Sequence, residues 1–559
     1  MSQKSIATYT VIGSGPVGIS VTTALLRKGK RVLLIDGGES LDEGTNRKLE
    51  TARQLFSEYL PSAEQNRSFI HTVKSNVEAS NKGVEIKRTY GSDYPYRKAD
   101  QQIHPESSLT GQITPSLAVG GYSNVWGAAV LPYTKDDIID WPISYSELVE
   151  GYQQVVQDMR VSGADSDFEG IFPKLNAPNF PLTLSKQAEK IRATLERSRF
   201  ALTSKNLAFG AARLSFRQSL GREFSSQDEC TQCGLCMYGC PHELIYSSRH
   251  ALILLKRKFP NQLTHLPGII VDRLEERTYD TLIFGKETEL NLPRTIRTKN
   301  VFLAAGALAS TRILLHSFGD FSTTLQLKVS EYFMLPLLGP RYDGDLNLTP
   351  QHTLAQLFLE LQDKNISQRL IHLQLYTYND LYKKGLESMF GRLSKLTTPL
   401  LRRLHIIQGY LHSENSSTIG LKIHSKQDPR LVLTGNQAAS AKRIIQKVAI
   451  KMLKLSPHTG LLPLIPMLSI GKPGDGRHVG GTFPMSKEDK PYSTDLLGRP
   501  RGSDKRLERV FLADSANFTS IPAPTITLSA MANGTRIASI VADMDDHQSA
   551  DYNTAEGAN

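Results

Sequence analysis

The chain has 559 residues, of which 40% are hydrophobic and 22% charged, and its formal net charge is +11. This length allows one very large domain or several ordinary ones, and the composition excludes a disordered or collagen-like chain. No apolar run reaches the roughly 18 residues that a membrane-spanning helix requires. We expect no nucleic-acid partner, because no nucleic-acid-binding motif accompanies the positive charge.

A dinucleotide-binding motif occupies the first part of the chain. Residues 7–35 predict a strand, a glycine-rich turn, a helix and a second strand, which Asp36 follows. Gly13 permits the tight turn, Gly15 lets the backbone approach a pyrophosphate, and Gly18 lets helix and strand pack closely. The carboxylate of Asp36 can accept hydrogen bonds from a ribose. The sequence therefore predicts one dinucleotide site.

All four cysteines of the chain lie close together in the sequence, which indicates a site. A disulfide framework would distribute them along the chain, whereas this spacing, C-x2-C-x2-C-x3-C-P, is typical of bacterial iron–sulfur loops. The predicted ligands are Cys230, Cys233, Cys236 and Cys240. We expect one cluster, [4Fe-4S] or [3Fe-4S], in a reducing compartment. A structural zinc site and unliganded thiols are the alternatives.

Three segments bear on where the protein acts. Residues 1–8 lack the charged-then-apolar build of a secretory signal, so we expect a cytoplasmic protein that is exported only with a signal-bearing partner. Residues 383–403 hold six bases and one acid among apolar residues, and either contact an anionic membrane surface or form a solvated helix on the protein. The acidic residues 546–559 are expected to form a flexible tail.

Several separated motifs resemble those of the GMC (glucose–methanol–choline) flavin oxidoreductases, in family order. Besides the N-terminal glycine turn, the matching segments are residues 120–127, 140–148, 304–315, 478–482 and 512–517. The resemblance spans about residues 8–335 and 470–542, and it favours FAD over NAD as the dinucleotide.

The resemblance implies an α/β fold (α+β overall) with two domains. A Rossmann-type FAD-binding domain would be assembled from residues 1–45, 110–135, 220–330 and 470–545, including the iron–sulfur loop 228–242. A sheet-based substrate domain would comprise residues 136–219 and 331–469.

The resemblance also implies further cofactor contacts. It places Gly120, Gly121, Ser123, Asn124 and Trp126 against the flavin ring, and Ala305, Gly306 and Asp514 along the rest of FAD. Some family members attach FAD covalently through a histidine in the first loop. Residues 123–126 contain none, so we expect noncovalent FAD.

His478 matches the catalytic histidine of the family. Oxidising an alcohol by hydride transfer to flavin requires an acceptor for the hydroxyl proton, and histidine is suited to this role. The family usually supplies a second histidine or asparagine, but Ala523 stands at that position. Asn517, Ser520 and Thr525 are the polar residues near it in sequence.

The cysteine loop resembles that of the iron–sulfur members of the family, the flavin subunits of sugar, gluconate and polyol dehydrogenases. Cys230, Cys236 and Cys240 match their pattern, and Cys233 is an addition that bears on the number of irons. The expected function is oxidation of a CH–OH group of a sugar, polyol or related alcohol, with electrons passing through the cluster to a protein or quinone acceptor. A noncatalytic electron carrier or redox sensor, and an oxygen-using oxidase with a zinc-bound loop, are the alternatives.

Overall fold

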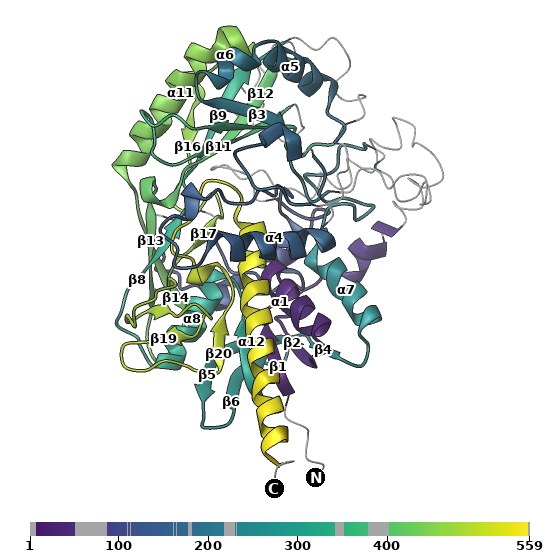
Figure 1. The fold of residues 1–559 in the computed structure, drawn as a ribbon, viewed down its shortest axis with the longest axis vertical. Coiled ribbons are helices and arrows are strands. Elements are labelled where there is room, and N and C mark those ends of the chain that lie inside the picture. Colours follow the sequence, from purple (N-terminus) through teal and green to yellow (C-terminus); the bar gives the residue numbers. More distant parts are fainter. Residues whose placement is uncertain are drawn as a thin grey trace.

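The computed structural model forms two lobes stacked along the long axis (Figure 1). It describes residues 7–556 apart from 48, 51–86, 109, 112, 160, 164, 177–181, 217–229, 231, 341–350 and 378–401, and side chains only to residue 546 in the last helix. The amphipathic segment predicted at 383–403 therefore lies outside the described residues, except for Arg402 and Arg403.

The lower lobe is built on a seven-stranded sheet. Its order is β4-β2-β1-β7-β6-β5, with β20 also paired to β7. Strands β4, β2, β1, β7 and β20 run parallel, whereas β5, β6 and β7 form an antiparallel meander. The strands are β1 (Ala7–Ile12), β2 (Val32–Ile35), β4 (Leu263–Leu266), β5 (Ile269–Glu276), β6 (Thr281–Glu287), β7 (Pro293–Leu303) and β20 (Val510–Leu512). The predicted βαβ unit and the α/β fold class are confirmed.

Helices cover both faces of this sheet, as a buried parallel sheet requires. Helices α1, α4 and α12 share one apolar core with β1 and β2, and α8 packs on the opposite face. The helices are α1 (Pro16–Arg27), α4 (Tyr145–Met159), α7 (Ser248–Lys258), α8 (Ala307–Phe318) and α12 (Ile526–Glu556). Helix α4 thus packs in the lower lobe, although the resemblance assigned residues 136–219 to the substrate domain.

The end of the last helix carries acidic residues on both sides of position 546, where the flexible tail is expected to begin. Helix α12 continues to Glu556. Asp543 forms an ion pair with Lys28, and Asp545 accepts hydrogen bonds from Tyr9 at 2.6 Å and from Asn300 at 3.0 Å. Lys28, which follows α1, and Tyr9 and Asn300 of the sheet therefore hold these two acids against the lower lobe.

The upper lobe is an antiparallel sheet of order β15-β9-β12-β11-β10-β3, with β16 also paired to β9. One face carries leucines, isoleucines and Phe333, which pack against α11 (Ala439–Thr459) and α5 (Lys186–Arg197). The other face carries polar groups, because successive residues of a strand point to opposite faces. The strands are β3 (Leu207–Ala211), β9 (Tyr332–Leu338), β10 (Leu357–Leu361), β11 (Ile371–Tyr376), β12 (Leu404–Tyr410), β15 (Leu462–Pro463) and β16 (Ser469–Ile470).

A small sheet of order β14-β13-β8-β17 lies beside α8 in the core of the lower lobe. Its strands are β8 (Leu325–Val329), β13 (Thr418–Ile423), β14 (Leu431–Asn436) and β17 (Val479–Gly480). Strand β8 leads directly into β9 of the upper sheet. Because β17 pairs with β8, the residue before it, His478, is held between the two lobes (Figure 1).

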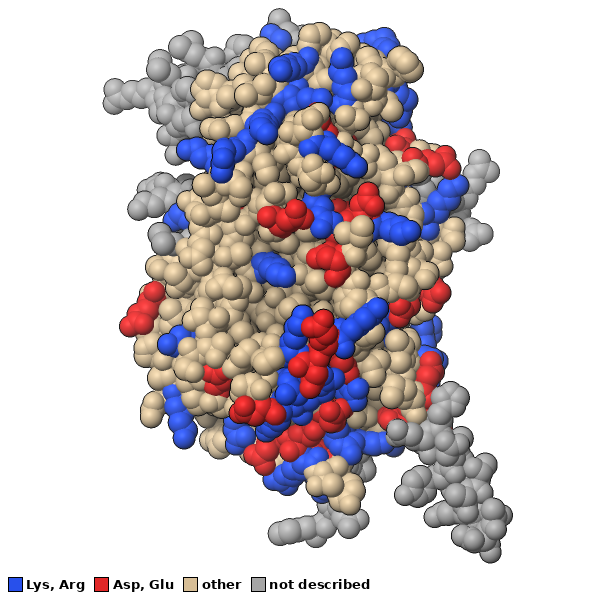
Figure 2. All heavy atoms as spheres, turned by 60° about the vertical axis from the view of Figure 1, so that its left-hand side comes forward, with Lys and Arg blue, Asp and Glu red and all other residues tan. Residues whose placement is uncertain are grey.

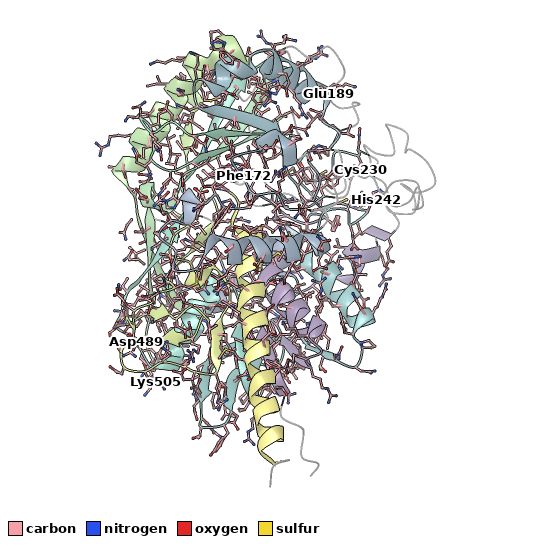
Figure 3. All side chains as sticks on the ribbon, viewed as in Figure 1. Phe172, Glu189, Cys230, His242, Asp489 and Lys505 are labelled. Atoms are coloured by element: carbon pink, nitrogen blue, oxygen red, sulfur yellow. The ribbon has the colours of Figure 1, made fainter. Side chains whose placement is uncertain are left out.

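The surface shown in Figure 2 carries basic and acidic side chains side by side in its lower half rather than a basic face. Asp489 pairs with Arg501 and Arg506, and Asp495 pairs with Arg499 and Arg506. Figure 3 labels Asp489 in this region. Among the helices that the structure describes, none combines the length and apolar character needed to cross a bilayer.

His405 of β12 makes the stability of the upper lobe depend on pH. Its side chain is buried and neither ring nitrogen has a hydrogen-bond partner within the described chain. Burial lowers the pKa of His405 to about 4 from the ordinary 6.5. Between about pH 6.5 and pH 4, His405 binds a proton in the unfolded chain but not in the folded protein. The free energy of unfolding therefore falls as the pH drops through this range.

We expect His405→Leu to reduce this acid sensitivity. The difference between a pKa of 6.5 and one of about 4 corresponds to about 3 kcal/mol. The loss of unfolding free energy between pH 8 and pH 4 should therefore be smaller in the variant than in wild type by up to about that amount. Urea unfolding of both proteins across this pH range measures it. His458→Leu, on the partly exposed end of α11, is the control. Parallel pH curves for wild type and His405→Leu would contradict the prediction.

Candidate active site

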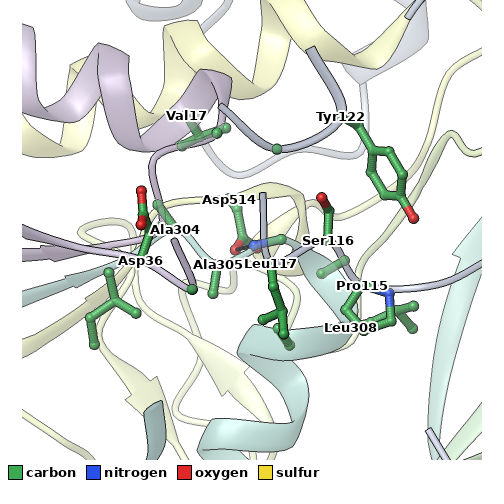
Figure 4. Close-up of a pocket in the computed structure, with 18 of the residues that line it drawn as sticks. Val17, Asp36, Pro115, Ser116, Leu117, Tyr122, Ala304, Ala305, Leu308 and Asp514 are labelled. Carbon is green, nitrogen blue, oxygen red and sulfur yellow. Dashed lines mark hydrogen bonds between the residues drawn. The ribbon is translucent and has the colours of Figure 1, made fainter. Parts of the chain in front are cut away.

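A deep cavity opens at the carboxyl ends of the parallel strands in the lower lobe (Figure 4). Ile12 ends β1, Asp36 follows β2 and Ala304 follows β7, and all three line it. Its empty volume, including the open mouth, is about 1420 Å³. Ligands of open α/β sheets bind at this edge, where the loops after the strands diverge.

The glycine turn shapes one wall of the cavity. Gly13 has φ +103°, and a Cβ there would lie 2.4 Å from the carbonyl oxygen of Ala304. A Cβ on Gly18 would lie 1.7 Å from the carbonyl oxygen of Gly13, so Gly18 permits the close packing predicted for it. Gly15 faces open space and lines the cavity at the N-terminus of α1. A helix N-terminus offers unpaired N–H groups to a phosphate.

Asp36 lies at one end of the cavity. Its carboxylate accepts a hydrogen bond from the backbone N–H of Gly38 at 3.0 Å and lies 3.1 Å from Nε2 of His265 on β4. Figure 4 places Asp36 and Tyr122 on opposite sides of the cavity. The cavity therefore extends from Asp36 at one end to Tyr122 at the other.

Asp514 organises the wall formed by Ala305 and Gly306. Its Oδ2 accepts hydrogen bonds from the Gly306 N–H at 2.9 Å and the Ser310 hydroxyl at 2.5 Å, and its Oδ1 accepts one from the Ala516 N–H at 2.9 Å. Burial raises the pKa of Asp514, whereas these bonds lower it. Ala305, Gly306 and Asp514 all line the cavity.

The loop at residues 120–126 meets the cavity through Gly121, and through Tyr122, which sequence reasoning missed. Gly120, Ser123 and Asn124 do not line it. The Gly120 N–H donates to Ser14 at 3.0 Å, and Ser123 donates to the Gly120 carbonyl at 2.6 Å. Asn124 donates to the Gly121 carbonyl at 2.8 Å. These residues hold the loop in shape rather than contacting the cavity.

The other side of this loop faces the cysteine segment. A small second cavity is lined by Ser123, Asn124 and Trp126 together with Cys236 and Cys240. Trp126 donates from Nε1 to the Tyr246 carbonyl at 2.8 Å and packs beside the apolar cluster that contains Cys236. The loop therefore separates the nucleotide cavity from the cysteines.

Lys87 joins the same two regions and was not anticipated from the sequence. Its Nζ donates to the Trp126 carbonyl at 2.7 Å. Burial lowers the pKa of Lys87 to about 8, while the nearby Cys236 and Cys240 raise it.

The four cysteines are not packed as closely as the ligands of a single metal ion. Among the described residues, no three cysteine sulfurs lie within 4.8 Å of one another. Ligands of one tetrahedral zinc ion, with Zn–S bonds of about 2.3 Å, stand only about 3.8 Å apart. The described spacing therefore differs from that of a zinc site. The cysteines form no disulfide, and burial raises the pKa of the Cys240 thiol to about 12.

His478 reaches the interface between the lobes. Its ring stacks on Tyr410 of β12, with centroids 4.7 Å apart and planes 23° apart. Its Nδ1 is buried without a hydrogen-bond partner in the described chain. Burial, helped by His372, lowers the pKa of His478 to about 3. The imidazole is therefore neutral and able to accept a proton.

Ala523 offers no polar group beside His478. It is fully buried and packs with Tyr332 and Tyr410.

The three polar candidates near Ala523 in sequence are engaged elsewhere. Asn517 donates to the Leu512 carbonyl, Ser520 to Asp140, and Thr525 accepts from the Leu131 N–H. The structure does not bring them together as a replacement for the second catalytic residue.

A row of polar side chains on the upper sheet escaped sequence analysis. Tyr332, Tyr410, His372 and Glu360 stand opposite one another on four neighbouring strands. His372 Nδ1 lies 2.8 Å from Glu360 Oε1, and both side chains are buried. Only the strand register brings these residues together, and a single sequence does not reveal register.

The fold is similar to that of several solved oxidase structures. No protein-family model and no curated protein sequence matches the chain. Three solved structures of GMC-family oxidoreductases are similar. Pyridoxine 4-oxidase from Mesorbium loti is 14% identical (TM-score 0.58, 95% of this chain, 98% of the other). A fungal aryl-alcohol oxidase is 13% identical (TM-score 0.56, 97% of this chain, 99% of the other). A formate oxidase is 11% identical (TM-score 0.59, 97% of this chain, 100% of the other).

We expect Asp514→Ala to weaken FAD binding. The change leaves two buried N–H groups without an acceptor, at roughly 1–3 kcal/mol each, and frees the 305–306 turn from its anchor. The FAD content of purified protein and its thermal midpoint should both fall. Asp504→Ala, at an exposed position, is the control. FAD content equal to that of wild type in Asp514→Ala would contradict the assignment.

Proposed function

We propose that this protein is a GMC-type, FAD-dependent dehydrogenase that oxidises a CH–OH group of a sugar, polyol or related alcohol. Electrons would leave through one iron–sulfur cluster to a protein or quinone acceptor. The observation that carries this proposal is the loop at residues 120–126, which lines the nucleotide cavity on one side and the cysteine segment on the other.

The cavity suits FAD because each part of the cofactor would meet matching groups. Asp36 would accept hydrogen bonds from the ribose, and the N-terminus of α1 after Gly15 would face the pyrophosphate. Gly121 and Tyr122 lie where the flavin ring would end. When bound, FAD supplies an acceptor for the hydride of the alcohol.

His478 would take the proton of the alcohol hydroxyl. Its ring is neutral at ordinary pH, so a nitrogen lone pair is available to the hydroxyl proton, and stacking on Tyr410 fixes its orientation. The polar row of the upper sheet, with Glu360 and His372, faces this histidine through Tyr410. Carboxylate and imidazole groups on that face suit a substrate rich in hydroxyl groups.

The cysteine segment would hold the cluster. Its spacing is that of iron–sulfur loops, and thiolates bound to different irons stand wider apart than ligands of one zinc ion. A cluster there would accept electrons singly across the 120–126 loop, which favours a dehydrogenase over the oxygen-using chemistry named for the similar structures. Its acceptor would be met in the cytoplasm or at a membrane surface contacted by residues 383–403.

A noncatalytic flavin and iron–sulfur carrier is the second candidate. It is favoured by Ala523, since the position that would assist His478 is apolar and closed by Tyr332 and Tyr410. Reduction of the flavin by an alcohol separates the two functions, because a carrier would remain oxidised with every alcohol tested.

We expect His478→Asn to slow the reduction of bound FAD by alcohol about 10²–10⁴-fold, the usual contribution of a general base. Anaerobic stopped-flow spectroscopy measures this rate, with His250→Asn on the surface of α7 as control. Since the pKa of His478 lies near 3, the wild-type rate should persist as the pH falls from 8 to about 5. A rate that declines with a midpoint near pH 6.5 would contradict a neutral, buried base.

Iron and acid-labile sulfide analysis of anaerobically purified protein tests the cluster. We expect Cys236→Ser to lose nearly all iron while retaining FAD, because Cys236 is buried beside Trp126. Cys233→Ser should retain a three-iron cluster if Cys233 binds the fourth iron, visible by EPR. Zinc without sulfide, or no metal after reconstitution, would reject the iron–sulfur part of the proposal.

A further inference from the structure

Arg477 stands next to His478 and lines the nucleotide cavity. It lies in the left-handed region with φ +57°, which is rare for a residue other than glycine. A turn holds it there, because the Arg477 N–H donates to the Gly474 carbonyl at 2.9 Å. Backbone strain of this kind concentrates at functional sites, where the fold enforces an unusual direction for one side chain.

The guanidinium of Arg477 rests on two tyrosines rather than on an acid. Its Cζ lies 5.4 Å from the ring centroid of Tyr96 and 5.5 Å from that of Tyr122. Nη1 donates to the Tyr96 hydroxyl at 3.0 Å. Burial lowers the pKa of Arg477, but Tyr96 and Tyr122 raise it further, so the group is charged.

No carboxylate of the described chain forms an ion pair with Arg477. Asp475, two residues earlier, raises the pKa of Arg477 without an ion-pair contact, and its carboxylate accepts a hydrogen bond from the Lys472 N–H at 2.8 Å. Arg312, the other arginine that lines the cavity, differs: it lies 3.5 Å from Asp272 and donates to the Val271 carbonyl. A buried charge is costly unless it is paired, so the charge of Arg477 is available to an anion in the cavity.

The position of Arg477 within the cavity identifies which part of FAD it would meet. Asp36 marks the ribose end, and Tyr122 lies on the opposite side (Figure 4). Arg477 lies over Tyr122 and precedes His478, so its charge is placed at the flavin end rather than at the pyrophosphate.

The position of Arg477 would supply a positive charge that the neutral His478 does not. Oxidation of an alcohol sends the O–H proton to a base and the C–H hydride, with its electron pair, to the flavin, and a carbonyl product forms. The reduced ring then carries negative charge over N1 and the C2 carbonyl. A fixed positive charge nearby stabilises it. His478 is neutral before the reaction and cannot provide that charge beforehand.

We propose that Arg477 is the cation that stabilises the negative charge of the reduced flavin ring. This inference rests on the proposed FAD site, and it divides two tasks between neighbours: His478 accepts the proton, and Arg477 holds the charge. It assigns Arg477 to the cofactor and not to an acidic group of the substrate.

Sulfite binding to the oxidised holoenzyme tests the inference without alcohol and without the cluster. The sulfur lone pair of sulfite forms a bond to flavin N5, and the electron pair displaced into the ring leaves the same negative charge at N1. We expect Arg477→Met and Arg477→Gln to weaken sulfite binding at least tenfold and to lower the flavin reduction potential. Arg477→Lys should retain most of both properties. Arg257→Met, which removes one exposed positive charge near the end of α7, is the control.

Arg477→Met and Arg477→Gln are both tested, because one of them can fail to fold or to bind FAD while the other remains measurable. Sulfite affinity and flavin potential equal to wild type in a FAD-loaded neutral variant would overturn the inference, as would a change only in the preference for acidic substrates. Wild-type protein that binds no FAD would instead refute the proposed function. The two failures are therefore distinguishable.

Discussion

The cavity exists because two backbone segments cross at the carboxyl ends of β1 and β7 more closely than a side chain would permit. The Ala304 carbonyl occupies the place of a Cβ on Gly13, and the Gly13 carbonyl occupies the place of one on Gly18. These contacts fix the start of α1 against the sheet, with its N-terminal N–H groups facing the cavity. Asp514 completes the arrangement from β20, because it holds the Gly306 turn that follows β7.

A second consequence follows from the position of the 120–126 loop against this crossing. The Gly120 N–H donates to Ser14 inside the glycine turn, and Ser123 accepts a hydrogen bond from the Ser248 N–H at the start of α7. The loop is thus clamped between the nucleotide turn and the segment that follows the cysteines. Under the proposed function, this short loop would keep the flavin site and the cluster site at a constant separation.

The sequence was most informative where local backbone requirements produce a motif. The glycine turn, Asp36 and the first two strands of the lower lobe were predictable, because each depends on residues near one another in the chain. The packing of α4 in the lower lobe was not, since an amphipathic helix does not reveal which core it joins. The row of polar side chains from Tyr332 to Glu360 was not predictable either, because only the pairing register of the strands brings these residues together. Arg477 offered one signal, a charged residue beside His478 in a glycine-rich turn, but its lack of an acidic partner is a property of the folded chain.

The environment of His478 also explains why an apolar residue is tolerated at position 523. A second polar group would be needed if the first histidine had to be held in place or kept charged by a hydrogen bond. Here Tyr410 holds the ring by stacking, and burial keeps it neutral. Ala523 gives Tyr332 and Tyr410 room to pack together, since a larger side chain at this fully buried position would displace one of them. The orientation of His478 thus comes from the upper sheet, through its aromatic contact with Tyr410.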